Sequence, residues 1–254
     1  MLIAINKEIF ETIYYASIKA SCDLAKTDGA YATYEGSPIS QGKFQFDLWG
    51  VTPTKRWDWD KLREDIKKHG VRNSLTTCIM PTASTASILG NEASCEAQTS
   101  NMYTRSVLSG TFILVNKYLV KELVKLNLWG DNLRKKIINE NGSVHNIPEV
   151  PTNLKEIFKT VYEIKQKDVI DMAADRGAYV CQSQSLNLWL EDPTYNNLTS
   201  MHFYSWSKGL KTGIYYLRRR ARHHAQQFTI EPEKKTGSNK PNHDNEEICE
   251  MCSS

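Results

Sequence analysis

Three short segments of the sequence carry residue types that can bind an anion or take part in oxidation and reduction. The first, residues 80–87, reads Met-Pro-Thr-Ala-Ser-Thr-Ala-Ser and follows the apolar run 75–80. If a strand ends and a helix begins there, free backbone N–H groups and the positive end of the helix dipole converge beside the hydroxyl groups. Such an arrangement can bind a phosphate. The alternative is that the Ser and Thr residues only cap the helix, which is their commoner role.

The second segment contains two adjacent phenols, Tyr215 and Tyr216, shortly after Gly213. In a regular strand the two rings would face opposite sides and only pack against their neighbours. A phenol has a pKa of about 10, so at neutral pH it is oxidised by losing an electron and a proton together. Two rings held in contact could pass the oxidised state from one to the other. That interpretation needs a locally irregular backbone, which Gly213 would permit.

The third segment is the Cys-x-x-Cys pair formed by Cys249 and Cys252. Such a pair can form a disulfide and exchange it with other thiols. We favour this redox function over inert thiols or a metal site with His243, because there is no second Cys-x-x-Cys and the spacing fits no known zinc finger. Residues 231–245 lack the apolar side chains needed for a core, so we expect a flexible tail. A coil of about 20 residues reaches about 25 Å.

The bulk composition excludes several classes of function. The chain has 254 residues and a formal charge of only +3, which indicates neither a nucleic-acid partner nor a membrane surface. Lys7, Glu8 and Glu11 interrupt what would be the apolar core of an N-terminal signal peptide. No apolar run is long enough to span a bilayer. We therefore expect a cytoplasmic protein with reduced thiols and no bound metal.

The spacing of apolar residues predicts the elements that must position these segments. Helices are predicted at residues 7–26, 59–69, 118–126, 131–139, 154–174 and 197–210. Extended segments are predicted at 75–80, 179–190 and 214–219, with the first of them a buried strand, and a loop is predicted at 31–53. Asn6 is the expected N-cap of the first helix and Gly29 its expected end. Because strands and helices alternate, we predict an α/β architecture with parallel strands.

Taken together, these features resemble one family, the large subunit of class I ribonucleotide reductases of the eukaryotic and viral type. The resemblance covers nearly all of residues 5–230. It is carried by separate blocks in the same order, namely Phe10–Tyr15, Tyr34–Pro38, Arg72–Leu75, Met80–Gly90, Thr99–Asn101, Val107–Gly110, Asn141–Ser143, Gln182–Asn187 and Leu198–Arg218.

The resemblance implies a fold and a substrate site. The fold would be α/β, with residues 1–230 forming the C-terminal part of a ten-stranded α/β barrel and residues 231–254 a flexible redox tail. Thr82, Ala83, Ser84 and Thr85 would bind the diphosphate of a ribonucleoside diphosphate substrate.

It also implies a redox role for the other two segments. Tyr215 and Tyr216 would relay a radical from the small subunit, which holds a diiron-tyrosyl radical. Cys249 and Cys252 would re-reduce the active-site disulfide and then be reduced by thioredoxin or glutaredoxin.

Several features of the family lie upstream of the position that Met1 matches. They are the thiyl-radical cysteine with its neighbouring Asn and Glu, the active-site cysteine pair, and the effector sites for ATP and dATP. We therefore expect that the chain is inactive alone and needs an N-terminal portion of the large subunit, as a split-gene product would, or that its gene is incomplete. A non-catalytic remnant that binds and modulates a reductase subunit is an alternative.

A basic run at residues 218–224 departs from the family, which more often has Thr at the place of Arg219 and Pro at the place of Ala221. Such a run is usually a solvated face, which is the interpretation we favour. The basic run also supports a different class of function, a nucleic-acid-binding module whose arginines bind phosphate groups. Salt-sensitive binding that is lost on mutating Arg219, Arg220 and Arg222 would favour the module.

Overall fold

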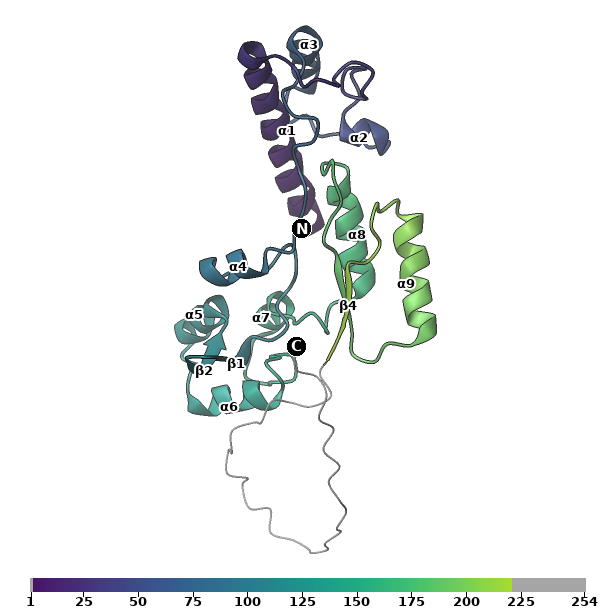
Figure 1. The fold of residues 1–254 in the computed structure, drawn as a ribbon. Helices are drawn as coiled ribbons and strands as arrows, with labels where there is room; N and C mark the ends of the chain where they lie inside the picture. The colour runs from purple at the N-terminus through teal and green to yellow at the C-terminus, as the bar shows by residue number, and fades with distance from the viewer. Residues whose placement is uncertain (1, 221–254) are drawn as a thin grey trace, which may run out of the picture. The chain divides into compact units, whose positions relative to one another are not determined.

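The computed structural model describes residues 2–220 (Figure 1). The helices are α1 (Leu2–Asp28), α2 (Gln45–Leu48), α3 (Trp59–His69), α4 (Ala83–Leu89), α5 (Lys117–Lys125), α6 (Asp131–Asn139), α7 (Thr152–Ile157), α8 (Gln166–Gly177) and α9 (Tyr195–Ser207). The strands are β1 (Met102–Val107), β2 (Gly110–Val115), β3 (Asn187–Leu190) and β4 (Tyr216–Arg219). Within these residues no helix is both long and apolar enough to cross a membrane.

An aromatic core joins α1 to α3 and to the loop between them. Phe44, Phe46 and Trp59 are buried, and their ring centroids lie 4.7–5.3 Å apart. Inclined aromatic contacts of this kind stabilise a core beyond the area they bury. Glu11 of α1 is fully buried beside them, and its Oε1 accepts hydrogen bonds from the Thr54 backbone and hydroxyl and from Trp59 Nε1. These donors offset much of the cost of burying a carboxylate.

A second core lies between the hairpin β1–β2 and the helices α5 and α6. The strands pair antiparallel, with Met102 opposite Val115. Leu123 of α5 and Ile137 of α6 are almost completely buried in this core. Asn101 ties the hairpin to the chain beyond α6, because its buried side-chain amide donates to the carbonyl oxygen of Gly142 at 3.0 Å.

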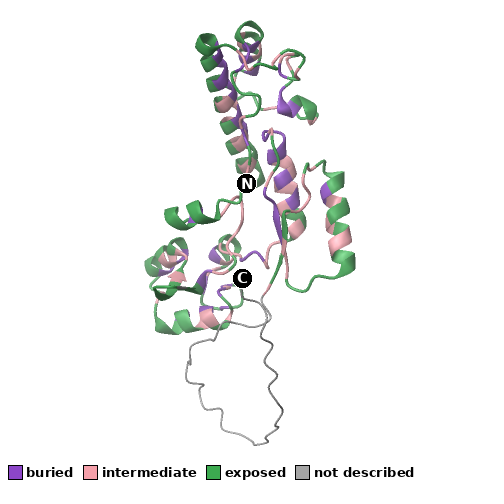
Figure 2. Cartoon of the chain, in the orientation of Figure 1, coloured by how far each residue is buried: buried purple, intermediate pink, exposed green. Residues whose placement is uncertain are grey.

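Three extended segments run parallel to one another and position the candidate site. β3 pairs with β4, with Asn187 opposite Tyr216. Just before β3, Gln184 forms a parallel bridge with Ile79. Segment 76–80 and β4 therefore both pair with the stretch 183–190. Leu188 of β3 is fully buried in a core formed with α8, and Figure 2 shows buried residues along both elements.

Most of the helix predictions are confirmed. α6 has the predicted bounds, and the ends of α5 and α9 lie within three residues of the prediction. α1 ends before Gly29 and α3 before Gly70, and both glycines adopt the positive φ that favours this residue at a helix end. The predicted N-cap is wrong, because α1 already begins at Leu2 and the Asn6 side chain instead donates to the carbonyl oxygen of Met172.

The prediction of a single helix over residues 154–174 is wrong. The chain leaves the helical path between α7 and α8, where the Val161 N–H donates to the carbonyl oxygen of Gln98 at 2.8 Å. Glu163 accepts a hydrogen bond from the Thr160 N–H at 2.7 Å and so satisfies a backbone group that helix formation would have used. Val161 is buried through this tertiary contact, which is why the apolar spacing looked helical.

Two further predictions need correction. The loop predicted at 31–53 contains the short helix α2, and the extended segment predicted at 179–190 is a regular strand only in its last four residues. The hairpin β1–β2 was not predicted, because its strands do not alternate cleanly between buried and exposed residues. The α/β class itself is confirmed, with the pair β3–β4 parallel as expected.

Candidate functional site

The hydroxyl-rich turn forms the start of α4, as predicted. Thr82 precedes the helix in the left-handed conformation, with φ +51° and ψ +24°. Its hydroxyl does not cap α4, and instead accepts a hydrogen bond from the Ser94 N–H at 2.8 Å. Ala83, Ser84 and Thr85 are exposed. The first N–H groups of a helix have no intrahelical acceptor, so this surface offers backbone donors and hydroxyl groups together.

The segment before the turn is extended but is not the buried strand that was predicted. Thr77 is buried, whereas Cys78 and Met80 are exposed, and the bridge between Ile79 and Gln184 is isolated. The segment pairs along one side only within the described part of the chain, which explains why apolar residues in it remain exposed.

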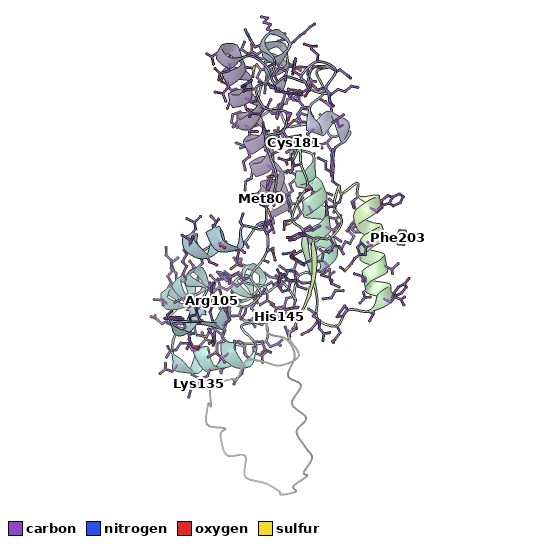
Figure 3. The ribbon with its side chains drawn as sticks, viewed as in Figure 1. Met80, Arg105, Lys135, His145, Cys181 and Phe203 are labelled. Atoms are coloured by element: carbon purple, nitrogen blue, oxygen red, sulfur yellow. The ribbon has the colours of Figure 1, made fainter. Side chains whose placement is uncertain are left out.

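Cys181 joins this segment to the stretch that leads into β3. Its sulfur accepts hydrogen bonds from the backbone N–H groups of Thr76 and Thr77, each at 3.1 Å, and lies 3.3 Å from the Thr77 hydroxyl. Met80 and Cys181 mark the two segments in Figure 3. Burial alone would raise the pKa of Cys181, but the hydrogen bonds from Thr77 and Thr76 outweigh it and hold the pKa below its usual value.

Replacing Thr77 with valine should therefore slow the alkylation of Cys181. The variant loses the hydroxyl that lies 3.3 Å from the sulfur and helps to lower its pKa, so the thiol pKa rises and less thiolate is present at pH 7. Half a pKa unit corresponds to a rate about threefold lower. Mass spectrometry after iodoacetamide treatment would measure the rate, with exposed Cys78 as the internal reference. An unchanged ratio of Cys181 to Cys78 alkylation would contradict the assigned role of Thr77.

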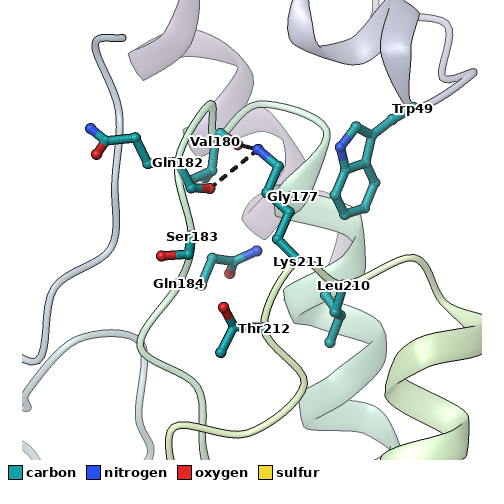
Figure 4. Close-up of a pocket in the computed structure, with 9 residues that line it drawn as sticks. All are labelled: Trp49, Gly177, Val180, Gln182, Ser183, Gln184, Leu210, Lys211 and Thr212. Carbon is teal, nitrogen blue, oxygen red and sulfur yellow. Dashed lines mark hydrogen bonds between the residues drawn. The ribbon is translucent and has the colours of Figure 1, made fainter.

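Lys211 also binds residues 180–182, the stretch that contains Cys181 (Figure 4). Its amino group donates to the carbonyl oxygens of Val180, Cys181 and Gln182, at 3.0, 2.7 and 3.3 Å. Burial lowers the pKa of Lys211. The loop after α9 is thereby fixed to the chain that leads into β3, just before the tyrosine pair.

The rings of Tyr215 and Tyr216 are in contact rather than on opposite sides of a strand. Their centroids lie 4.4 Å apart with an interplanar angle of 63°. Tyr215 sits in a bend before β4, so the alternation of a regular strand does not apply to the pair. The side-chain hydrogen bond with Tyr216 raises the pKa of Tyr215. Both side chains are about half exposed.

Gly213 contributes to this geometry in a way that the sequence did not indicate. It is not one of the glycines with positive φ. A Cβ at this position would instead lie 3.2 Å from the Cβ of Ser205, a buried residue of α9. The glycine therefore allows the chain to pass close to α9.

Hydrogen bonds connect the hydroxyl-rich turn to the tyrosine pair through one stretch of backbone. The Ser94 N–H donates to Thr82, and the Ser94 hydroxyl donates to the carbonyl oxygen of Ser185 at 3.3 Å. The next carbonyl, that of Leu186, accepts a hydrogen bond from the Tyr215 N–H at 2.7 Å. The roles of Ser94 and Ser185 were not predicted from the sequence, because neither lies in a pattern that distinguishes a linking residue from any other serine.

The first arginines of the basic run lie against aromatic rings. The guanidinium of Arg218 lies 5.0 Å from the ring centroid of Tyr216 and 5.7 Å from that of Trp189. Arg220 forms an ion pair with Glu191 and lies over the ring of Tyr162. These contacts give both arginines a local structural role. The remainder of the run, residues 221–224, lies outside the described residues.

The predicted redox pair Cys249 and Cys252, with His243, also lies outside the described residues. Within residues 2–220 no group of three or more His, Cys, Asp or Glu side chains is arranged to hold a metal ion. The candidate site described by the structure thus consists of the turn at 82–85, the stretch 183–187 and the tyrosine pair.

Comparison with known proteins identifies the family. The family model described as "Ribonucleotide reductase, barrel domain" matches residues 2–216. The chain belongs to the ribonucleotide reductase barrel-domain family. The reductase barrel predicted from the sequence is thereby confirmed as the fold family, and the parallel segments around β3 are part of that barrel domain.

Similar reductase chains come from several kingdoms. The chain is 58% identical to the ribonucleoside-diphosphate reductase large subunit of Caenorhabditis elegans, over 89% of this chain and 29% of that protein. It is 56% identical to the large chain 2 of Saccharomyces cerevisiae, over 90% of this chain and 26% of that protein. The class Id ribonucleotide reductase alpha subunit of Actinobacillus ureae aligns with a TM-score of 0.65 and 28% identity, over 86% of this chain and 34% of that one.

The alignments cover most of this chain but only part of each relative. The chain spans between a quarter and a third of the length of these relatives. It is similar to the C-terminal region of ribonucleoside-diphosphate reductase large subunits.

Proposed function

We propose that this chain supplies the C-terminal part of the catalytic barrel of a ribonucleoside-diphosphate reductase, which reduces ribonucleotides to deoxyribonucleotides. The observation that carries the proposal is the contact between Tyr215 and Tyr216, whose backbone is hydrogen-bonded to the stretch that also holds the hydroxyl-rich turn. A turn that can bind an anion, linked by hydrogen bonds to a pair of oxidisable phenols, suits a reaction in which a radical attacks a phosphorylated substrate.

Residues 82–85 would bind the diphosphate of the substrate. The first N–H groups of α4 and the hydroxyls of Ser84 and Thr85 are exposed and can donate to phosphate oxygens. The Thr82 hydroxyl accepts a hydrogen bond from the Ser94 N–H, which holds the turn in place and leaves the O–H hydrogen free to donate to the phosphate. The substrate class follows the names of the relatives, which are ribonucleoside-diphosphate reductases.

The tyrosine pair would relay a radical from the small subunit and its diiron-tyrosyl cofactor. In each transfer a tyrosyl radical takes one electron and one proton from the neighbouring phenol. The first ring returns to a neutral phenol and the second becomes the radical, so no charge accumulates. The centroid distance of 4.4 Å keeps the two rings in contact for this exchange.

The remaining parts of the proposal concern segments and partners beyond residues 2–220. Cys249 and Cys252 would reduce the active-site disulfide by thiol–disulfide exchange and then be reduced by thioredoxin or glutaredoxin. The thiyl-radical cysteine, the active-site cysteine pair and the effector sites for ATP and dATP would come from an N-terminal portion of the large subunit. The complex would act in the cytoplasm.

Reconstitution tests the proposal. The chain is mixed with an N-terminal portion of a large subunit, a radical-loaded small subunit, thioredoxin and a ribonucleoside diphosphate, and the deoxyribonucleotide is measured. We expect product from the complete mixture and none when the chain is omitted. Absence of product from the complete mixture, with the subunits shown to associate, would favour the non-catalytic remnant and overturn the proposal.

A further inference from the structure

A cavity lies between α8, the start of β3 and residues 95–97; it is not lined by the hydroxyl-rich turn but shares residues 185–187 with the candidate site. Its volume is about 450 Å³. Val169 and Met172 of α8, Val161 and Ile164 before it, and Trp189 of β3 form much of its wall. A cavity of this size, largely apolar and with a few polar groups, is typical of a binding site for a small organic molecule.

Arg176 is the polar group that makes this cavity distinctive. Its side chain lines the cavity although the residue is only 2% exposed. Nε donates to the Gln184 side chain at 2.7 Å, and Nη1 has no hydrogen-bond partner within residues 2–220. Burial lowers the pKa of Arg176, but the ordinary value is so far above neutral that the guanidinium stays charged. The cavity wall therefore contains a buried cation for which residues 2–220 supply no anion.

The acidic residues that line the cavity do not supply that anion. Both carboxylate oxygens of Glu96 are used, one by the Asn187 amide at 2.7 Å and the other by Trp189 Nε1 at 3.3 Å. Glu156 forms an ion pair with Lys159 at 2.5 Å. Asp168 makes no ion pair with Arg176 in the described part of the chain. The hydroxyl of Ser185, which also lines the cavity, is buried without a partner in these residues.

We propose that this cavity binds a small carboxylic acid with an apolar body, whose carboxylate forms an ion pair with the guanidinium of Arg176 in the cavity wall. A guanidinium and a carboxylate match in geometry, and the pair gains strength when it is removed from water. One buried cation balances one carboxylate, whereas a doubly charged phosphate would leave an uncompensated charge against apolar walls. The volume holds roughly 15 non-hydrogen atoms at about 30 Å³ each. An aromatic acid such as 2-naphthoate fits these limits.

The proposal does not depend on the reductase function, and its test needs only the purified 254-residue chain. Isothermal titration at pH 7 compares 2-naphthoate with 2-naphthamide, which has the same shape without the charge. We expect the acid to bind at least about tenfold more tightly than the amide, since a charged partner strengthens a hydrogen bond substantially. Equal affinity for the two compounds would overturn the proposal.

Two variants and one control test whether Arg176, rather than another cation, causes the preference for the acid over the amide. Arg176→Gln should bind the acid and the amide equally, and the retained binding of the amide shows that the cavity is still formed. Arg176→Lys should keep part of the preference. Lys159→Gln, the matched control, removes the same charge from the cavity lining and should leave the preference unchanged. Loss of the preference in Lys159→Gln, or its survival in Arg176→Gln, would exclude Arg176 as the anchor.

The alkylation rate of Cys95, a residue of the cavity wall, shows whether the acid binds in the cavity. This measurement uses the unmodified chain, so it does not depend on the folding of the variants. Cys95 lines the cavity, and burial raises its pKa. Saturating 2-naphthoate should slow the alkylation of Cys95 in the unmodified chain and leave that of exposed Cys78 unchanged. Binding of the acid without protection of Cys95 would place the site elsewhere and overturn the proposal.

Discussion

Replacing Gly142 with alanine should lower the free energy of unfolding by about 3–5 kcal/mol. Gly142 has a φ of +83°, which an alanine adopts only with strain. A Cβ there would overlap Ser100 Oγ and lie 2.8 Å from Ser100 Cβ and 2.9 Å from the backbone nitrogen of Asn101. The Ser100 hydroxyl donates a hydrogen bond to the Met102 carbonyl oxygen at 2.7 Å, so moving it away from the added Cβ would break that bond. Urea unfolding followed by circular dichroism would measure the change.

The matched control is Gly29→Ala. Gly29 has a similar φ of +77°, but a Cβ there would meet nothing within 4 Å. Gly29→Ala therefore introduces backbone strain without a clash and should lower the free energy of unfolding by about 1 kcal/mol. The difference between the two variants isolates the clash with Ser100 and the loss of the hydrogen bonds from Asn101 to the Gly142 carbonyl oxygen. Equal destabilisation of the two variants would show that the chain around Asn101 relaxes without cost.

In the reconstituted reductase, Tyr216→Phe should lower the rate of deoxyribonucleotide formation by at least about 100-fold, equivalent to about 2.7 kcal/mol in the activation barrier. Phenylalanine keeps the ring against Tyr215 and under the Arg218 guanidinium. It has no phenolic O–H, so it cannot give up an electron and a proton together. Tyr215→Phe should have an effect of similar size, because the two rings would act in series.

The control for the tyrosine pair is Tyr162→Phe. Tyr162 also packs against β3, at 5.8 Å from the Trp189 ring, and also carries an arginine over its ring. Its loss of a hydroxyl should change the rate by no more than about threefold, which is less than 1 kcal/mol. Measurement of subunit association in each variant separates a failure of radical transfer from a failure of assembly. Retention of the full rate by Tyr216→Phe would remove the phenol from the proposed relay.

The sequence alone was sufficient to predict helices and helix ends that are determined by interactions between neighbouring residues. The helix α6, and the ends of α1 and α3 at Gly29 and Gly70, were predicted because apolar spacing and a glycine with positive φ act within a few residues. The family was also identified from the sequence, because many separate blocks in a fixed order leave few alternatives, and the match over residues 2–216 confirms it.

Tertiary structure decided what depends on contacts between distant residues. The break between α7 and α8 follows from the hydrogen bond of Val161 to Gln98, some sixty positions earlier, which no local pattern reveals. The contact between Tyr215 and Tyr216 depends on the bond to Leu186 that anchors the bend, although the sequence indicated only that two phenols are adjacent. The burial of Arg176, whose Nη1 has no hydrogen-bond partner within residues 2–220, likewise arises only on folding. Residue types set which chemistry is possible, whereas distance and removal from water, which arise only on folding, determine which groups can carry it out.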